Sequence, residues 1–289
     1  VMDDPTPGTC RARWIVGLVL LMFLAGCSQT RLAYRYADWG VVWWVEDYIS
    51  LTGEQEAQLS QDLEALRQWH CSAELPRYQH WLAVLKSDLA EGTPSEATVL
   101  FHQEQLMDFL PELLERSTPV AVNLLSSLSD EQVAQLADNM AEKQQELEQE
   151  MLEGTPAQTA QARSERTIER IERWLGDLNQ QQRAIVENWS ANRGRQTEIW
   201  LTGRRNWQLA LLDTLERRRQ SGFAEQVNEL LVHSERARGA EYQAMLAESR
   251  VAMAGLMHDL LQAGDSRHQD QLLARASELK GDFAALTCS

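Results

Sequence analysis

Cysteine and histidine are the residue types of this sequence best suited to metal binding or catalysis. The six histidines, at positions 70, 80, 102, 233, 258 and 268, form no His-Glu-x-x-His pair. His70 lies beside Cys71, but no second pair of ligands follows at the spacing of a zinc site. The sequence also has no Gly-x-Ser-x-Gly elbow and no phosphate-binding glycine loop. We therefore expect no enzyme activity, no metal and no non-covalent cofactor.

The first 30 residues have the order of parts typical of a secretory signal. Arg11 and Arg13 precede the uncharged apolar run 14–24, which is 11 residues long, whereas a helix that spans a bilayer needs about 20. The run ends in Leu24-Ala25-Gly26-Cys27, which resembles the bacterial lipoprotein processing site. That resemblance implies that Cys27 receives lipid on its thiol, that cleavage follows before it, and that the new amine is acylated.

The residue after the lipidated cysteine indicates whether the protein stays in the inner membrane or moves to the outer membrane. In bacterial lipoproteins, an aspartate directly after the lipidated cysteine is associated with retention in the inner membrane. This chain has Ser28 at that position. The resemblance therefore implies a protein anchored to the outer membrane and facing the periplasm, since several acyl chains hold a protein stably at a bilayer. The chain begins Val-Met, so we expect translation to start at Met2 or at an alternative start codon for Val1.

Two cysteines remain after processing. Cys10 leaves with the signal and Cys27 carries lipid, so Cys71 and Cys288 face an oxidising compartment. They are 217 positions apart and form one candidate disulfide. The alternative is two free thiols.

Apolar residues in the body of the chain recur at helical spacing. Steps of three, four and seven place each set on one face of a helix, as in Leu59, Leu63 and Leu66, in Val133, Leu136, Met140, Leu147 and Met151, in Trp207, Leu211 and Leu215, and in Met253, Leu256 and Leu260. No convincing run of alternating β-branched residues occurs. The sequence predicts an all-α fold, an elongated multi-helix bundle of antiparallel capped helices.

Several helix starts are marked by capping motifs. Leu51-Thr52-Gly53-Glu54-Gln55 and Leu128-Ser129-Asp130-Glu131-Gln132 each place a hydroxyl three residues before a glutamine, with a leading leucine as an entry contact. A weaker copy begins at Leu178-Asn179 and ends at Gln182. Thr93-Pro94 and Thr155-Pro156 predict two further starts, each with a hydroxyl cap before a proline.

A weak internal repeat suggests two similar halves. Residues 51–90 align with 178–216 at an offset near 126, which matches Trp81 to Trp207 and Leu85 to Leu211. The expected organisation is a signal peptide over 1–26, a lipidated tether over 27–33 and a helical periplasmic domain over 34–289. A boundary between halves would fall near 154–178.

Charge is distributed unevenly along the chain. The net charge of −16 disfavours nucleic acid as a partner. Residues 51–153 hold 20 acidic and 5 basic side chains, whereas residues 163–219 hold 8 acidic and 12 basic ones. The two segments either pack as complementary faces or present a bipolar surface to a partner. Arginine interleaved with tryptophan is typical of binding hot spots, and the candidate partner surface comprises Arg173, Trp174, Trp189, Trp200, Arg204, Arg205 and Trp207.

Aromatic residues crowd the segment after Cys27, namely Tyr34, Tyr36, Trp39, Trp43, Trp44 and Tyr48. Glu46 and Asp47 would face anionic lipid headgroups unfavourably, so we expect a first core helix packed under the bundle. The alternative is a helix at the membrane interface, where tryptophan and tyrosine are favoured.

Two family resemblances follow from these motifs. The chain resembles a family of uncharacterised bacterial lipoproteins over nearly the whole mature sequence. The resemblance rests on the lipoprotein processing site Leu24–Cys27 (the lipobox), on Tyr34-x-x-x-Asp38-Trp39, on Trp43-Trp44, and on Asp47-Tyr48 before Leu51-Thr52-x-x-Gln55. The Leu-Thr-x-x-Gln and Leu-Ser-x-x-Gln motifs also resemble those of the periplasmic chaperones Spy and CpxP, small helical proteins that form cradle-shaped dimers. This chain is longer, lipid-anchored and acidic by comparison.

These observations predict a lipid-anchored binding or quality-control module facing the periplasm. Its partners would be the membrane, through the lipid, and protein clients or envelope proteins. The alternative is a structural or assembly lipoprotein dedicated to one envelope partner.

Overall fold

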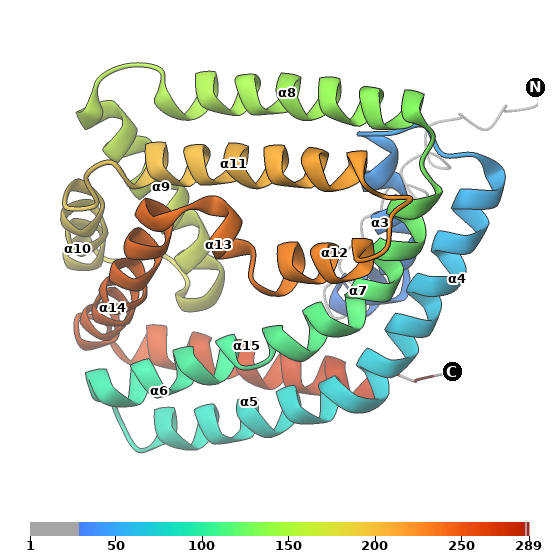
Figure 1. The fold of residues 1–289 in the computed structure, drawn as a ribbon. Coiled ribbons are helices and arrows are strands. Elements are labelled where there is room, and N and C mark those ends of the chain that lie inside the picture. Colours follow the sequence, from blue (N-terminus) through green and yellow to red (C-terminus); the bar gives the residue numbers. More distant parts are fainter. Residues whose placement is uncertain (1–28, 287, 289) are drawn as a thin grey trace, which may run out of the picture.

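The computed structural model describes residues 29–286 and 288, and every regular element within them is helical (Figure 1). The all-α prediction is therefore confirmed. Residues 1–26 and Cys27 lie outside the described residues. The predicted tether, 27–33, overlaps the first described helix. The helices are α2 Gln29–Arg35, α3 Ala37–Glu46, α4 Gly53–Trp69, α5 Leu75–Ala90, α6 Glu96–Met107, α7 Leu110–Ser127, α8 Asp130–Leu152, α9 Pro156–Leu175, α10 Gln180–Ala191, α11 Gln196–Glu216, α12 Phe223–Val232, α13 Ser234–Arg238, α14 Ala240–Gln262 and α15 Ser266–Ala285.

Polar side chains define where several of these helices begin. Thr52, Ser129, Thr155 and Asn179 are N-caps, and each forms a reciprocal capping box with the glutamine three residues later. The expected start at Thr93-Pro94 is wrong, because the cap of α6 is Ser95, whose hydroxyl accepts from the backbone N–H of Thr98. The carbonyl of Pro94 lies 3.2 Å from Nδ1 of His258 on α14, so Pro94 belongs to the preceding turn.

A π-helical turn, His70–Glu74, joins α4 to α5 and coincides with a change of direction (Figure 1). Pro76 has no backbone N–H to donate to a carbonyl of the preceding turn, so the α-helical hydrogen bonds are interrupted between α4 and α5. The turn contains Cys71, which is buried. Its sulfur lies 2.07 Å from that of Cys288, at disulfide-bonding distance.

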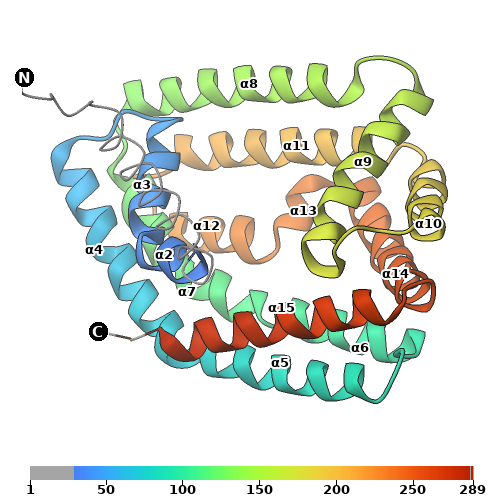
Figure 2. The same ribbon diagram turned by 180° about the vertical axis from the view of Figure 1, so that it is seen from behind.

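The helices of the first part of the chain, α3 to α8, pack largely against helices of the second part, α9 to α15. The order α3 to α8 recurs as α9, α10, α11, α12, α14 and α15, with α4 packing on α7 as α10 packs on α14. Between the two parts, α5 packs along α15 and α8 along α11, while α7 contacts α12 and α6 contacts α14. Figures 1 and 2 place α8 and α11 on one side of the molecule and α5 and α15 on the opposite side. The contacts made by α4 to α8 therefore resemble those made by α10 to α15, whereas the predicted boundary near 154–178 stays a prediction.

Two apolar clusters hold this arrangement together. The first joins α7, α8, α11 and α12 and includes Leu136, Met140, Leu211, Leu215 and Val227. The second joins α9, α10 and α14 and includes Ile171, Leu175, Val186, Leu256 and Leu260. None of the described helices is both long and apolar enough to cross a membrane.

Candidate binding groove

The acidic and arginine-rich segments of the chain lie side by side as α8 and α11. Arg205 on α11 pairs with Glu148 on α8, and Arg218, at the end of the arginine-rich segment, pairs with Asp130. The Arg218 guanidinium also lowers the pKa of the Asp130 carboxyl by hydrogen bonding to it. The complementary-face interpretation of the charge pattern therefore describes this helix pair.

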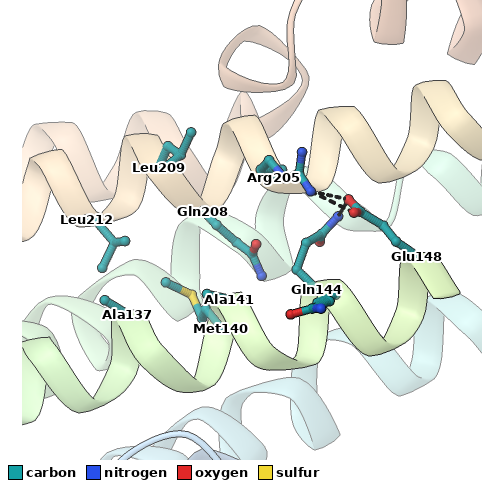
Figure 3. Close-up of a pocket in the computed structure, with 10 residues that line it drawn as sticks. Ala137, Met140, Ala141, Gln144, Glu148, Arg205, Gln208, Leu209 and Leu212 are labelled. Atoms are coloured by element: carbon teal, nitrogen blue, oxygen red, sulfur yellow. Dashed lines mark hydrogen bonds and ion pairs between the residues drawn. The ribbon is translucent and has the colours of Figure 1, made fainter.

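A groove of about 350 Å³ lies between these two helices (Figure 3). Its α8 wall combines the small side chains of Ala137 and Ala141 with buried Met140. Leu209 and Leu212 line it from α11, and 58% of Leu209 is exposed. Two alanines four residues apart leave room on one face of α8, so the groove offers apolar surface that an incoming side chain could cover.

The polar end of the groove is held by a hydrogen-bond network. Gln144 is buried, donates to the carbonyl of Leu201 at 3.1 Å, and accepts from Arg204. Arg205 donates to both carboxylate oxygens of Glu148, at 2.6 and 2.7 Å (Figure 3). Because these groups are satisfied by one another, they fix the spacing of α8 and α11 around the apolar part.

Amide side chains also line the groove. Figure 3 shows Gln208 pointing from α11 toward α8, and Gln145 adds a second amide to the lining. Amides can both donate to and accept from a peptide backbone, whereas the alanines and leucines suit an apolar side chain. Among the residues that the structure describes, no group of three or more His, Cys, Asp or Glu side chains is placed to hold a metal ion.

The predicted arginine and tryptophan surface is divided by the fold. Arg204 and Arg205 lie at the groove, as described above. Trp207 packs against the first apolar cluster and donates from Nε1 to the carbonyl of Leu230 at 2.8 Å, whereas Trp189 packs against the second cluster. Trp200 is half-buried on α11, and Arg173 and Trp174 are exposed on α9. Sequence reasoning missed the groove's apolar lining, whose only signal was the alanine spacing on α8.

The two Leu-(Thr/Ser)-x-x-Gln motifs meet in the structure. Gln55 and Gln132 hydrogen-bond each other reciprocally, at 3.1 and 2.7 Å between amide N and O atoms. Each also donates to the backbone carbonyl two residues before the partner's N-cap, Gln55 to Ser127 at 3.0 Å and Gln132 to Ser50 at 2.8 Å. The motifs therefore join the starts of α4 and α8, in addition to capping them.

The weaker third motif meets a partner that the sequence pattern did not predict. Gln182 is fully buried and donates to the carbonyl of Leu260, while Asn179 donates to that of Ala263. Gln182 and Asn179 therefore contact the segment that leads into α15, and the start of α15 has its own capping box, made by Asp265 and His268. Nε2 of His268 lies 3.1 Å from the carbonyl of Asp177 and 3.2 Å from the Arg267 guanidinium. A histidine at the third position lies outside the usual Glu/Gln pattern of the capping box, which is why it was missed.

Helix α2 is fixed to the π-helical turn by an aromatic and imidazole cluster. The hydroxyl of Tyr34 lies 2.9 Å from Nδ1 of His70, and the hydroxyl of Tyr78 lies 3.1 Å from Nε2. Burial raises the pKa of Tyr34 to about 12 and lowers the pKa of His70. Both groups are therefore neutral at pH 7, and the cluster acts as a structural link between α2 and the start of α5.

These features define a class of protein: an all-helical protein whose first and second parts pack against each other, with joined helix starts and a groove between α8 and α11. The chain belongs to a family of unknown function, DUF6279, whose model matches residues 47–243. That match includes both walls of the groove. No curated protein and no solved structure matches the chain significantly.

Proposed function

We propose that this protein is a lipid-anchored binding or quality-control module on the periplasmic face of the outer membrane, without catalytic activity. The observation that carries the binding role is the α8–α11 groove, in which an exposed leucine and two alanines lie beside a fixed polar network. The lipobox at Leu24–Cys27 supports the anchor and the compartment.

The groove favours segments of unfolded protein over a small charged ligand. Its lining is mainly apolar, and its charged pair, Arg205 with Glu148, is already neutralised internally. An apolar side chain of a client would cover Leu209 and the alanines, while the exposed Gln145 amide is available to the client backbone. Burial of one such side chain contributes about 1.5–3 kcal/mol, which suits weak and reversible capture of many sequences.

Variants of the groove should weaken capture without unfolding the protein. Protein lacking residues 1–27 is expected to suppress the aggregation of several unrelated unfolded proteins at equimolar ratio, measured by light scattering. Leu209→Asp should reduce this suppression about tenfold because it places a charge where an apolar side chain would be buried. Ala141→Gln, at an exposed position on α8, should have a similar effect by filling the hollow with a polar side chain.

The matched control is Val251→Asp on α14. Val251 is 65% exposed and does not line the groove, so this variant should retain full suppression. If Leu209→Asp and Val251→Asp lose suppression of aggregation equally, general surface hydrophobicity, and not the groove, causes the suppression. No suppression by the unmodified sequence would exclude the quality-control role and leave the dedicated structural lipoprotein as the remaining reading.

A further inference from the structure

The aromatic segment forms an exposed face along α2 and α3. Leu32 lies on α2, Tyr36 lies at the junction, and Trp39 and Trp43 lie on α3, four residues apart and so on one side of that helix. Leu32, Tyr36 and Trp39 line one hollow. The exposed fractions of Leu32, Tyr36, Trp39 and Trp43 are 55%, 56%, 69% and 60%. The expectation of a core helix is therefore wrong for these side chains, because burial is satisfied by the other side of the helix.

That other side is firmly packed. Val42 on α3 is buried, and α3 packs on α4. Ile49, which follows the end of α3, is buried as well. The backbone leaves helical geometry at Tyr36, but its N–H donates to the carbonyl of Leu32 and its carbonyl accepts from the N–H of Gly40, which ties α2 to α3. Since Tyr34 is also held by His70, the aromatic face is presented by a fixed helix.

We propose that this face, Leu32, Tyr36, Trp39 and Trp43, lies on the surface of the lipid bilayer and orients the protein there. The inference rests on the proposed lipid anchor, because Cys27 precedes Leu32 by only five residues. Five extended residues reach about 17 Å at most. Acyl chains on Cys27 would therefore hold α2 within reach of the headgroups.

The residue types on the face suit a bilayer interface. Tryptophan and tyrosine combine an apolar ring with a polar atom and are favoured at headgroup depth. Leu32, Ala33, Tyr36 and Trp39 also line a shallow, almost wholly apolar hollow, which acyl chain or headgroup carbon could fill.

Charges along the helix agree with this orientation. Arg35 lies exposed at the end nearest Cys27, where a cation attracts anionic lipid, whereas Arg31 pairs with Asp282 at 3.1 Å. Glu46 is the last residue of α3, and Asp47 follows it. The ten residues of α3 span about 15 Å at a rise of 1.5 Å per residue, which exceeds the Debye length at physiological salt, about 8 Å. Asp47 is also 3.8 Å from Lys143. Asp38, in the first turn of α3, is a further acid of this segment and is partly buried.

The test uses protein that begins at Ser28, because the contacts described above all lie within residues 29–288. It should co-sediment with vesicles of three parts phosphatidylethanolamine to one part phosphatidylglycerol, with a blue shift of tryptophan fluorescence. The double variant Trp39→Ser, Trp43→Ser should reduce the partition coefficient about tenfold or more, since two large rings no longer leave water. The control Trp174→Ser removes an exposed tryptophan of α9 and should bind like the parent.

Three results would overturn the inference. These are no co-sedimentation of the parent protein, equal binding by the double variant, or dimers in sedimentation velocity that depend on Trp39 and Trp43 while vesicles are not bound. The last result would make a second copy of this chain the occupant. Acyl labelling of the full chain against Cys27→Ser separately tests the anchor, so failure of the anchor is distinguishable from failure of the aromatic face.

Discussion

Loss of the bond between Cys71 and Cys288 is expected to lower the free energy of unfolding by about 5 kcal/mol. The bond closes a loop of 217 residues, and in the chain-entropy model a loop of that size restricts the unfolded state by about this amount. The effect should be large because the bond joins the π-helical turn after α4 to the segment beyond α15. Those segments come from the first and second parts of the chain.

Urea denaturation with and without reductant measures this contribution. The double variant Cys71→Ser, Cys288→Ser should unfold at a lower urea concentration than the oxidised parent and should be insensitive to reductant. Two titratable thiols in unreduced protein, or no change in gel mobility on reduction, would contradict the pairing. An unchanged midpoint on reduction would instead contradict its energetic role.

Gln182→Ala is expected to lower the free energy of unfolding by about 3 kcal/mol. The Gln182 amide is fully buried, accepts from the backbone N–H of Asn179 at 3.0 Å, and donates to the carbonyl of Leu260 at 3.0 Å. Truncation would leave both backbone groups without these partners away from water, at about 1–3 kcal/mol for each unsatisfied group. The measurement is again urea denaturation, followed by circular dichroism at 222 nm.

Gln158→Ala is the matched control. Gln158 occupies the same position of a capping box, that of Thr155 on α9, but it is exposed. Its loss should cost about 1 kcal/mol or less, because water replaces the missing hydrogen bonds. Similar losses in the two variants would show that the glutamines act only as caps and that the contact between helix starts contributes little.

Local signals in the sequence predicted most of the helices. A cap depends on residues three apart, and an apolar face on residues three or four apart, so both are visible without the tertiary structure. The pairing of the helices was not visible in this way. Nothing near Gln55 indicates that its amide meets Gln132, 77 positions away. The contacts between α8 and α11 likewise join residues 57 positions apart, as in Gln144 with Leu201.

The errors have physical causes of the same kind. Thr93 had the right spacing for a cap, but Pro94 lies in a turn beside α14, and Ser95 takes the role. Trp39 and Trp43 were expected in a core helix because Glu46 and Asp47 would face anionic lipid headgroups unfavourably. The aliphatic side of α3 already fills its place in the core, which leaves the tryptophans exposed. Ala137 and Ala141 on α8 form a groove only because α11 lies opposite them, and the sequence does not show that pairing.

Site-specific photocrosslinking in intact cells tests the central claim most directly. A photoreactive amino acid is placed at position 209, in the groove, and separately at position 251 on α14, in the natively anchored protein. Adducts are then identified by mass spectrometry, with Cys27→Ser as a control for anchoring. The account predicts adducts with many unrelated exported proteins from position 209 and few from position 251. Equal capture at both positions, or one recurrent envelope protein alone, would contradict it.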